Sequence, residues 1–296
     1  MNLCQLFLSD LLIFLHVRAI IVQRERRDKM FSVKVLKANG ETKFVGRGEE
    51  EVYLVATSKY EEGDQIILEY SGEPRYFVFQ ADDAMGPALI FVKGIVQVKV
   101  PFGEARRGYS PKAFGGSCHY IYARFASREE IEAYRNQALN VYDCHENVNS
   151  YPHASANVET RNEAVFAARN AIDGVKANSS HGEWPYASWG INRDPKACLK
   201  IDFGNAIETD KIVVYLRADF PHDNWWKQMT FAFSDGSVVT GDLEKLATGQ
   251  TISFEKRTVT WVEVKELIKA EDESPFPALT QIEVYGRAAE KGGSAR

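Results

Sequence analysis

The chain has 296 residues, of which 45% are hydrophobic and 26% are charged. These proportions are ordinary for a soluble globular protein, and they exclude disordered, collagen-like and polytopic membrane proteins. The formal net charge of −5 argues against a nucleic-acid partner, because proteins that bind nucleic acids usually carry an excess of basic residues. Aromatic residues reach 12%, and they either fill cores or line a ligand site.

Residues 1–29 are predicted to be a non-native upstream extension or a weak hydrophobic leader. Asp10, His16 and Arg18 interrupt the apolar stretch, and the basic cluster follows it instead of preceding it as in a signal peptide. Arg26 and Arg27 can be encoded by AGG-AGG, which would be a bacterial ribosome-binding site just before Met30. We therefore expect translation from Met30, a cytoplasmic protein and no membrane partner. The alternative is export or membrane anchoring through residues 1–22.

Residues 30–126 are predicted to form an N-terminal β-sandwich domain. Short segments alternate apolar and polar residues, and turn-forming residues separate them without long helices. The expected strands are residues 31–37, 51–56, 65–70, 75–80 and 89–100. This half contains no recognisable chemical motif, and we interpret His119, beside Tyr120, as a structural histidine.

The four cysteines are far apart in the sequence and form no C-x-x-C pair. This spacing predicts neither a cysteine-based zinc site nor a disulfide-stapled scaffold. We interpret Cys4, Cys118, Cys144 and Cys198 as free buried thiols.

A linker helix is predicted over residues 127–138, because Ser127 and Glu130 match a capping box. A second β-rich domain follows over residues 139–287, and residues 288–296 are expected to form a flexible tail. A short helix is expected within residues 162–172. The expected strands are residues 198–203, 211–218, 229–233, 237–240, 258–264 and 281–285.

Several ordered pieces of this second unit carry a family resemblance. They are residues 136–140 (N-Q-A-L-N), 171–174 (A-I-D-G), 199–204 (L-K-I-D-F-G), 210–214 (D-K-I-V-V), 230–236 (T-F-A-F-S-D-G) and 278–286 (A-L-T-Q-I-E-V-Y-G). In order and spacing they resemble the discoidin, or coagulation factor 5/8 type C, family, which overlaps the galactose-binding-like carbohydrate-binding modules. The resemblance implies an eight-stranded antiparallel jelly roll whose loops bind ligands at one end. The expected fold class is therefore all-β, with two β-sandwich domains joined by a short helix.

The resemblance also implies a structural Ca²⁺ near the A-x-D-G turn. Asp173 and Asn178 would supply oxygen ligands, which Ca²⁺ prefers. Gln281 stands where many members of the family place a glutamate, and its carbonyl can coordinate but brings no charge. Calcium therefore stays an open expectation for this chain.

Two aromatic, polar-rich stretches are predicted to form ligand-binding loops, residues 181–190 and 217–226. Sugar recognition needs a flat aromatic face for the apolar side of the ring and directional polar groups for the hydroxyls. The candidate aromatic platforms are Trp184, Tyr186, Trp225 and Trp226. The candidate polar contacts are Arg217, Asp219, His222 and Asp223.

Structural roles remain open for several of these residues. Trp189 follows the A-x-D-G turn, as the buried core tryptophan of the family does. One of Trp225 and Trp226 should face inward, because neighbours on an extended chain point in opposite directions. Arg217 and Asp219 would also suit an ion pair that ties the loop to a strand.

The sequence predicts a non-catalytic protein that binds a glycan. Nucleophile elbows, zinc-binding histidine spacings and phosphate-binding glycine patterns are absent from the sequence. Two alternatives remain. The chain would act as an interaction module for a protein partner or for its own oligomer, or as a polysaccharide lyase or hydrolase that uses Asp219, His222 and Asp223.

Overall fold

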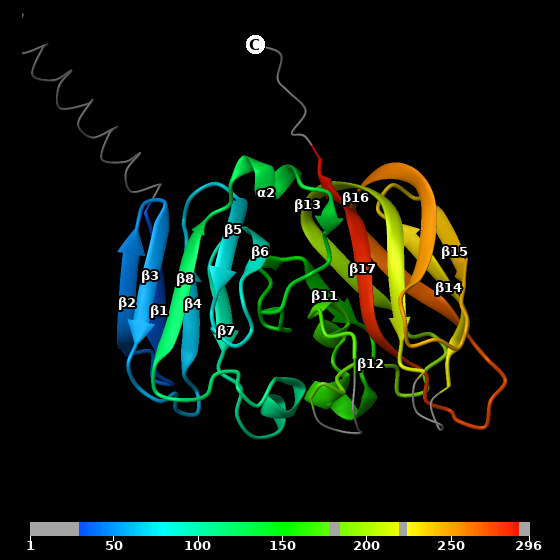
Figure 1. Ribbon diagram of the computed structural model, residues 1–296, viewed down its shortest axis with the longest axis horizontal. Helices are drawn as coiled ribbons and strands as arrows, with labels where there is room; N and C mark the ends of the chain where they lie inside the picture. The colour runs from blue at the N-terminus through cyan, green and yellow to red at the C-terminus, as the bar shows by residue number, and fades with distance from the viewer. Residues whose placement is uncertain (1–29, 178–183, 219–223, 290–296) are drawn as a thin grey trace, which may run out of the picture.

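The computed structural model of the protein describes residues 30–177, 184–218 and 224–289. It consists of two β-sandwich domains that lie side by side, as Figure 1 shows. The predicted all-β fold class is confirmed. The predicted leader and four of the predicted site residues lie outside the described residues: Asn178, Asp219, His222 and Asp223.

The N-terminal domain is built from two antiparallel sheets around one hydrophobic core. The first sheet has the order β2 (Thr42–Gly48), β1 (Phe31–Leu36), β4 (Gln65–Glu69) and β7 (Val96–Lys99). The second has the order β10 (Ser150–Tyr151), β6 (Ala88–Val92), β5 (Arg75–Gln80), β8 (His119–Phe125) and β3 (Glu51–Ala56). In β3 every second residue is buried, which is the alternation of a strand with one face on the core.

Two details of this domain differ from the sequence-based prediction. The strand expected over residues 89–100 is two strands, β6 and β7, separated by a turn that contains Gly94. Strands β2 and β8 were not predicted. The buried positions of β8 are His119, Ile121 and Ala123, so a histidine and a small residue occupy two of the three core positions and weaken the apolar alternation.

The C-terminal domain is one rolled antiparallel sheet around a second core. Its order is β12 (Trp189–Gly190), β17 (Ala278–Ala288), β13 (Leu199–Leu216), β16 (Gln250–Lys269), β14 (Trp226–Phe233) and β15 (Val238–Asp242). In addition, β11 (His153–Ala156) pairs with β13, and β9 (Arg135–Asn136) pairs with β17. The pairing of β13 with β16 shifts between Asp202 and Ile207, where Gly204 has a φ of +69°. Such an irregularity bends a long strand, so β13 can follow the roll around the core.

The helix between the domains is shorter than predicted. α2 (Arg128–Glu132) begins with the expected capping box of Ser127 and Glu130, but it ends at Ala133 instead of continuing to residue 138. Two residues later the chain forms β9 and pairs with β17. The pairing with β17 is possible only for an extended backbone, so the tertiary contact ends the helix.

Residues 140–156 contribute a core side chain and one strand to the N-terminal domain and one strand to the C-terminal domain. Tyr142 is buried in the N-terminal core, and its hydroxyl lies within hydrogen-bond distance of the carbonyl oxygens of Gly86 and Asp82. Strand β10 joins the N-terminal sheet, and β11, which follows at once, joins the C-terminal sheet. The domain boundary is therefore interlaced over this segment.

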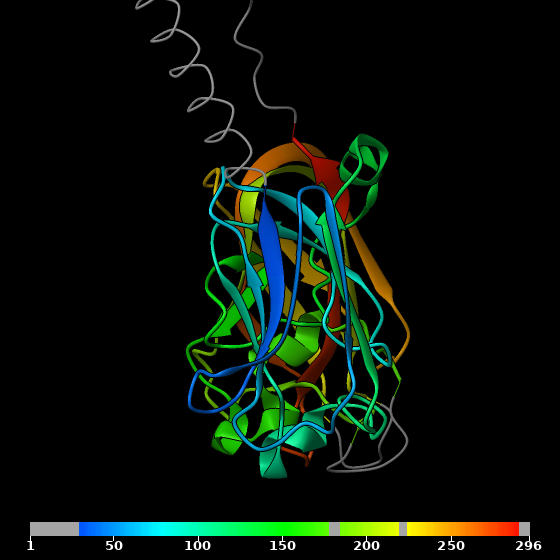
Figure 2. The same cartoon turned by 90° about the vertical axis from the view of Figure 1, so that its left-hand side faces the viewer.

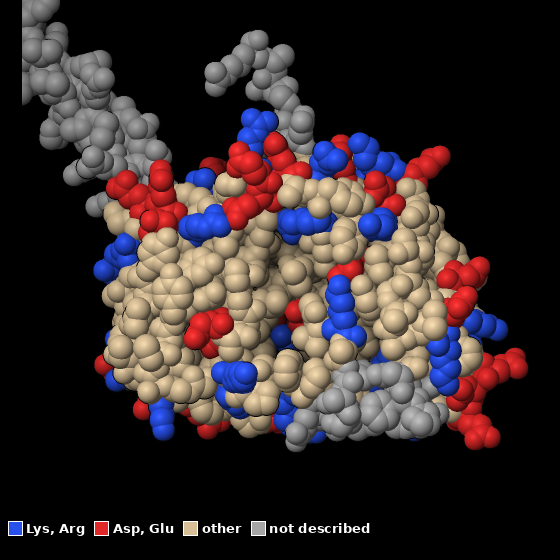
Figure 3. Space-filling view, viewed as in Figure 1, with Lys and Arg blue, Asp and Glu red and all other residues tan. Residues whose placement is uncertain are grey.

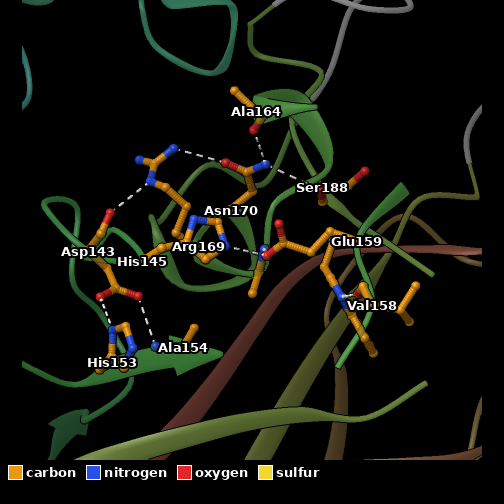
Figure 4. Close-up of polar contacts among 12 residues, drawn as sticks. Asp143, His145, His153, Ala154, Val158, Glu159, Ala164, Arg169, Asn170 and Ser188 are labelled. Carbon is orange, nitrogen blue, oxygen red and sulfur yellow. Dashed lines mark hydrogen bonds and ion pairs between the residues drawn. The ribbon is translucent and has the colours of Figure 1, made fainter. Parts of the chain in front are cut away.

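A buried polar cluster, drawn in Figure 4, holds this segment against the C-terminal domain. The Asp143 carboxylate accepts hydrogen bonds from His153 Nδ1 at 2.7 Å and from the backbone amide of Ala154 at 2.8 Å. Arg169 Nε donates to the carbonyl of Asp143 at 2.9 Å. The hydrogen bond to Asp143 raises the pKa of His153. Each group is matched to a partner within the protein, so we interpret this cluster as structural.

Figure 3 shows acidic and basic side chains mixed along the edge that carries α2, with no single basic patch on the face in view. Cys118, Cys144 and Cys198 are free thiols as predicted, but Cys118 is exposed and the other two are only half-buried. Among the described residues, no helix is both long and apolar enough to cross a membrane.

Candidate functional site

A pocket of about 250 Å³ opens in the C-terminal domain, among the connections at one end of the rolled sheet. Its walls come from η2 (Thr160–Asn162), η3 (Ala164–Phe166), β12 and the residues after it, the end of β13, and the segment before β17. The 3₁₀ helices and β12 lie at the lower end of Figure 1, and Figure 2 shows the same green segments at that end from the side. The pocket is lined by Thr160, Arg161, Phe166, Tyr186, Gly190, Ile191, Asn192, Arg193, Arg217, Pro275, Phe276, Pro277 and Ala278.

Two predicted site residues form the inner wall of this pocket. The guanidinium carbon of Arg217 lies 3.6 Å from the centroid of the Tyr186 ring, a cation–π stack. Tyr186 in turn meets Phe166 edge-on, with ring centroids 6.2 Å apart. Tyr186 is only 1% exposed, so it is a buried wall and not the open platform that we predicted. The backbone amide of Arg217 donates to the Ala278 carbonyl at 3.0 Å and fixes the end of β13.

The outer wall consists of residues that sequence reasoning missed. Phe276 is 47% exposed and is the most accessible aromatic ring of the pocket. The guanidinium carbon of Arg193 lies 4.5 Å from its ring centroid. The signal for this wall was an aromatic residue held between two prolines, at residues 275–277. A single aromatic residue is a weaker local signal than the two stretches that hold four of the five tryptophans.

A tight turn places Arg193 at the pocket. Asn192 and Arg193 both have positive φ angles, 48° and 62°. The Asn192 amide donates to Thr160 Oγ1 at 2.9 Å, which ties the turn to η2. A Cβ on Gly190 would lie 2.6 Å from the same oxygen atom, so this close approach requires glycine.

The charged residues of the pocket wall are all arginines. Arg161 pairs with Glu163 at 2.5 Å, which balances its charge. Arg193 stacks on Phe276 and makes no ion pair with another described residue. The wall thus combines aromatic faces with fork-shaped donors, a pairing that suits hydroxyl or carboxylate oxygens on a ring-shaped ligand.

The three predicted tryptophan platforms lie outside this pocket. Trp184 is 37% exposed and lines a hollow between the two domains. Trp225 is half-buried, with the Lys245 ammonium 5.2 Å from the centroid of its ring. Trp226 is 0% exposed and packs in the core against Trp189.

The prediction of Trp226 as a platform is wrong, because a ring without exposed surface cannot stack on a sugar. The alternative that one of the two neighbours faces inward is correct, and so is the structural role of Trp189. Of the eight predicted ligand contacts, the described residues bring only Tyr186 and Arg217 into this pocket.

Two of the three residues expected to ligate calcium, Asp173 and Gln281, lie together at the A-x-D-G turn, and the third, Asn178, lies outside the described residues. Asp173 Oδ1 accepts a hydrogen bond from the amide of Val175 at 2.8 Å, and Gln281 Oε1 accepts one from the amide of Gly174 at 3.0 Å. The buried guanidinium of Arg169 already acts electrostatically on Asp173.

Comparisons with known proteins cover the C-terminal half. Residues 147–285 match the family described as a domain of unknown function (DUF7402). Among curated proteins, no sequence matches this chain.

Three similar solved structures are small modules. A chitosan-binding module from a chitosanase/glucanase of Paenibacillus sp. IK-5 is 21% identical over 51% of this chain and 98% of that chain, with a TM-score of 0.36. A Streptococcus pneumoniae fucose-binding module is 20% identical over 51% and 96%, with a TM-score of 0.35. The family 32 carbohydrate-binding module of C. perfringens NanJ, solved with galactose, is 18% identical over 45% and 91%, with a TM-score of 0.35.

Proposed function

We propose that this protein binds a saccharide in the pocket between Tyr186, Arg193, Arg217 and Phe276. The observation that carries the proposal is the exposed ring of Phe276 beside the guanidinium of Arg193. An exposed ring covers the apolar face of a sugar, and a guanidinium next to it donates directional hydrogen bonds to ring substituents. The pocket supports this proposal by its chemistry; the three solved modules are too distant to assign a ligand.

The size of the pocket favours a terminal sugar over an extended chain segment. Its volume of about 250 Å³ lies just below the usual range for small-molecule sites, roughly 300–1,000 Å³. The excess of arginine favours a sugar that carries a carboxylate or several equatorial hydroxyls. The proposed role is recognition without catalysis; a polysaccharide lyase or hydrolase remains the alternative, and its Asp219, His222 and Asp223 lie outside the described residues.

A glycan array, followed by titration calorimetry with the best ligand, tests this proposal. We expect Phe276→Ala to weaken binding about tenfold, because a stacked ring contributes about 0.5–1.5 kcal/mol beyond the area it buries, and about 1.4 kcal/mol corresponds to tenfold. Arg193→Ala should weaken it to a similar extent. Both residues are partly exposed, so the variants should fold normally.

Trp184→Ala is the matched control, because it removes an exposed aromatic ring that lies outside the pocket. If Trp184→Ala loses binding and Phe276→Ala keeps it, the site lies in the hollow between the domains and not in this pocket. Binding of no glycan by the unmodified protein would overturn the proposed function itself.

A second candidate, assembly with a protein partner or another copy, is favoured by an exposed aromatic face on β3 and β8. Tyr53 lies opposite Tyr122, and Val55 lies opposite Tyr120. Tyr53, Val55 and Tyr120 are all exposed. Light scattering of the unmodified protein and of Tyr53→Ser would test this candidate, with a smaller particle for the variant as the supporting result.

A further inference from the structure

Asp82, Asp83 and His119 form a cluster in the N-terminal domain, far in sequence from the proposed saccharide pocket. One potential ligand atom from each residue lies within 4.8 Å of those of the other two. Among the described residues this is the one group of three or more histidine, cysteine or acidic side chains with such spacing. Asp82 and His119 are buried, whereas Asp83 is exposed, so the cluster is open to solvent on one side.

The surroundings of His119 determine which nitrogen atom carries its proton. The ring is 1% exposed, and Nε2 lies 3.1 Å from the carbonyl oxygen of Ser58. A carbonyl only accepts hydrogen bonds, so Nε2 must carry the proton in this contact. Nδ1 of the neutral ring then has a free lone pair, which is the form of histidine that binds metals.

That lone pair has no partner among the described residues, although Nδ1 is fully buried. A buried acceptor without a hydrogen bond is costly, and native proteins seldom leave one unsatisfied. The phenol of Tyr60, whose ring stacks on His119 with centroids 4.0 Å apart, also has a buried oxygen without a partner. Two polar atoms on stacked rings thus lack a hydrogen-bond partner from the described protein, and a bound group could satisfy both.

Asp82 is held in place for such a role. One of its carboxylate oxygens accepts the backbone amide of Ala84 at 2.9 Å, and the other accepts that of Phe114 at 2.7 Å. Each oxygen keeps a second lone pair, and the position of the carboxylate is fixed by the backbone on both sides. Asp83, being exposed, can turn inward to close the distance that a bound ion requires.

We propose that Asp82, Asp83 and His119 bind one divalent transition-metal ion with the coordination chemistry of Zn²⁺. An imidazole nitrogen with two carboxylates suits Zn²⁺ or a similar ion, whereas Ca²⁺ and Mg²⁺ prefer all-oxygen sites. Water would complete the coordination on the solvent side. This revises the sequence-based interpretation of His119 as structural only.

The test is a titration of the full-length, chelator-treated protein with Zn²⁺ by calorimetry. We expect one equivalent to bind, and Asp83→Asn to weaken binding at least tenfold. Asp83 is exposed, so this variant keeps the fold; its melting curve without metal should match that of the unmodified protein. His119→Asn should lose the same equivalent, with a melting curve to confirm that it folds.

Glu62→Gln is the matched control, because it removes an exposed carboxylate outside the cluster. It should bind Zn²⁺ like the unmodified protein. Equal binding by Asp83→Asn, or no equivalent bound by the unmodified protein, would overturn the proposal. Preferential binding of Ca²⁺ that depends on Asp83 would overturn the assignment to a transition metal.

Discussion

The buried carboxyl group of Asp173, in the A-x-D-G turn, makes the stability of the C-terminal domain depend on pH. Burial raises its pKa to about 6, and the nearby guanidinium of Arg169 limits this rise. An aspartate in the unfolded chain titrates near pH 3.9. The folded protein therefore holds this proton more tightly than the unfolded chain does.

The contribution of Asp173 to stability should depend on pH. It is fully present below about pH 3.9 and is lost as the pH rises through about 6, because the folded state must then bury the ionised form. Asp173→Asn should remove this dependence. The unfolding free energy of Asp173→Asn, relative to that of the unmodified protein, should therefore be up to about 3 kcal/mol higher at pH 7 than at pH 4. Urea denaturation from pH 4 to 7 measures the difference.

Asp242→Asn serves as the control for an exposed aspartate in the same domain. Parallel stability curves for the unmodified protein and Asp173→Asn would contradict the assignment of a raised pKa. The same experiment with added Ca²⁺ bears on the expected ion, because a calcium ion bound to Asp173 would stabilise the ionised carboxylate and the protein above pH 6.

The strands show where local pattern and tertiary packing agree. The expected strands at residues 198–203 and 211–218 are the two ends of the single long strand β13. The expected strand at residues 258–264 is the middle of β16, which runs from Gln250 to Lys269. Apolar alternation marks only the parts of a strand that face the core, whereas hydrogen bonding to neighbours extends a strand beyond them.

Trp225 and Trp226, where β14 begins, should differ strongly in their effect on stability. Trp226 fills the core against Trp189, so Trp226→Ala should cost about 3–5 kcal/mol, the usual range for emptying a large buried site. Trp225 is half-buried, and Trp225→Ala should cost about 1 kcal/mol. Equal losses in urea denaturation would contradict the inward orientation of Trp226.

At the scale of the molecule, the interlaced segment of residues 135–156 couples the folding of the two domains. Residues 135–136 pair with the C-terminal sheet, Tyr142 fills the N-terminal core, and β10 and β11 then join one sheet each. The residues that fill the N-terminal core and extend its sheet therefore lie on a segment that is anchored at both ends in the C-terminal sheet. The polar cluster around Asp143 and Arg169 adds buried hydrogen bonds at the same boundary (Figure 4).

We therefore expect a single calorimetric transition for the unmodified protein. Tyr142→Ala should destabilise the N-terminal core by about 3–5 kcal/mol and split the melt into two transitions. Tyr142→Phe keeps the ring and loses only the hydrogen bonds to Gly86 and Asp82, so it should keep one transition at a lower temperature. Two transitions in the unmodified protein would show that the segment does not couple the domains.

The sequence by itself determined the all-β class, the jelly-roll arrangement of the second half, the capping box at Ser127 and the core role of Trp189. These depend on local periodicity, on turn residues and on ordered family motifs, all of which lie within short stretches of chain. Only the tertiary structure decided which aromatic rings are exposed to a ligand: Phe276 is exposed, whereas Trp226 is buried. It also brought Asp82 and Asp83 to His119, residues separated by more than one strand. The physical reason is that exposure and side-chain convergence depend on which distant segments pack together, and no local pattern records that packing.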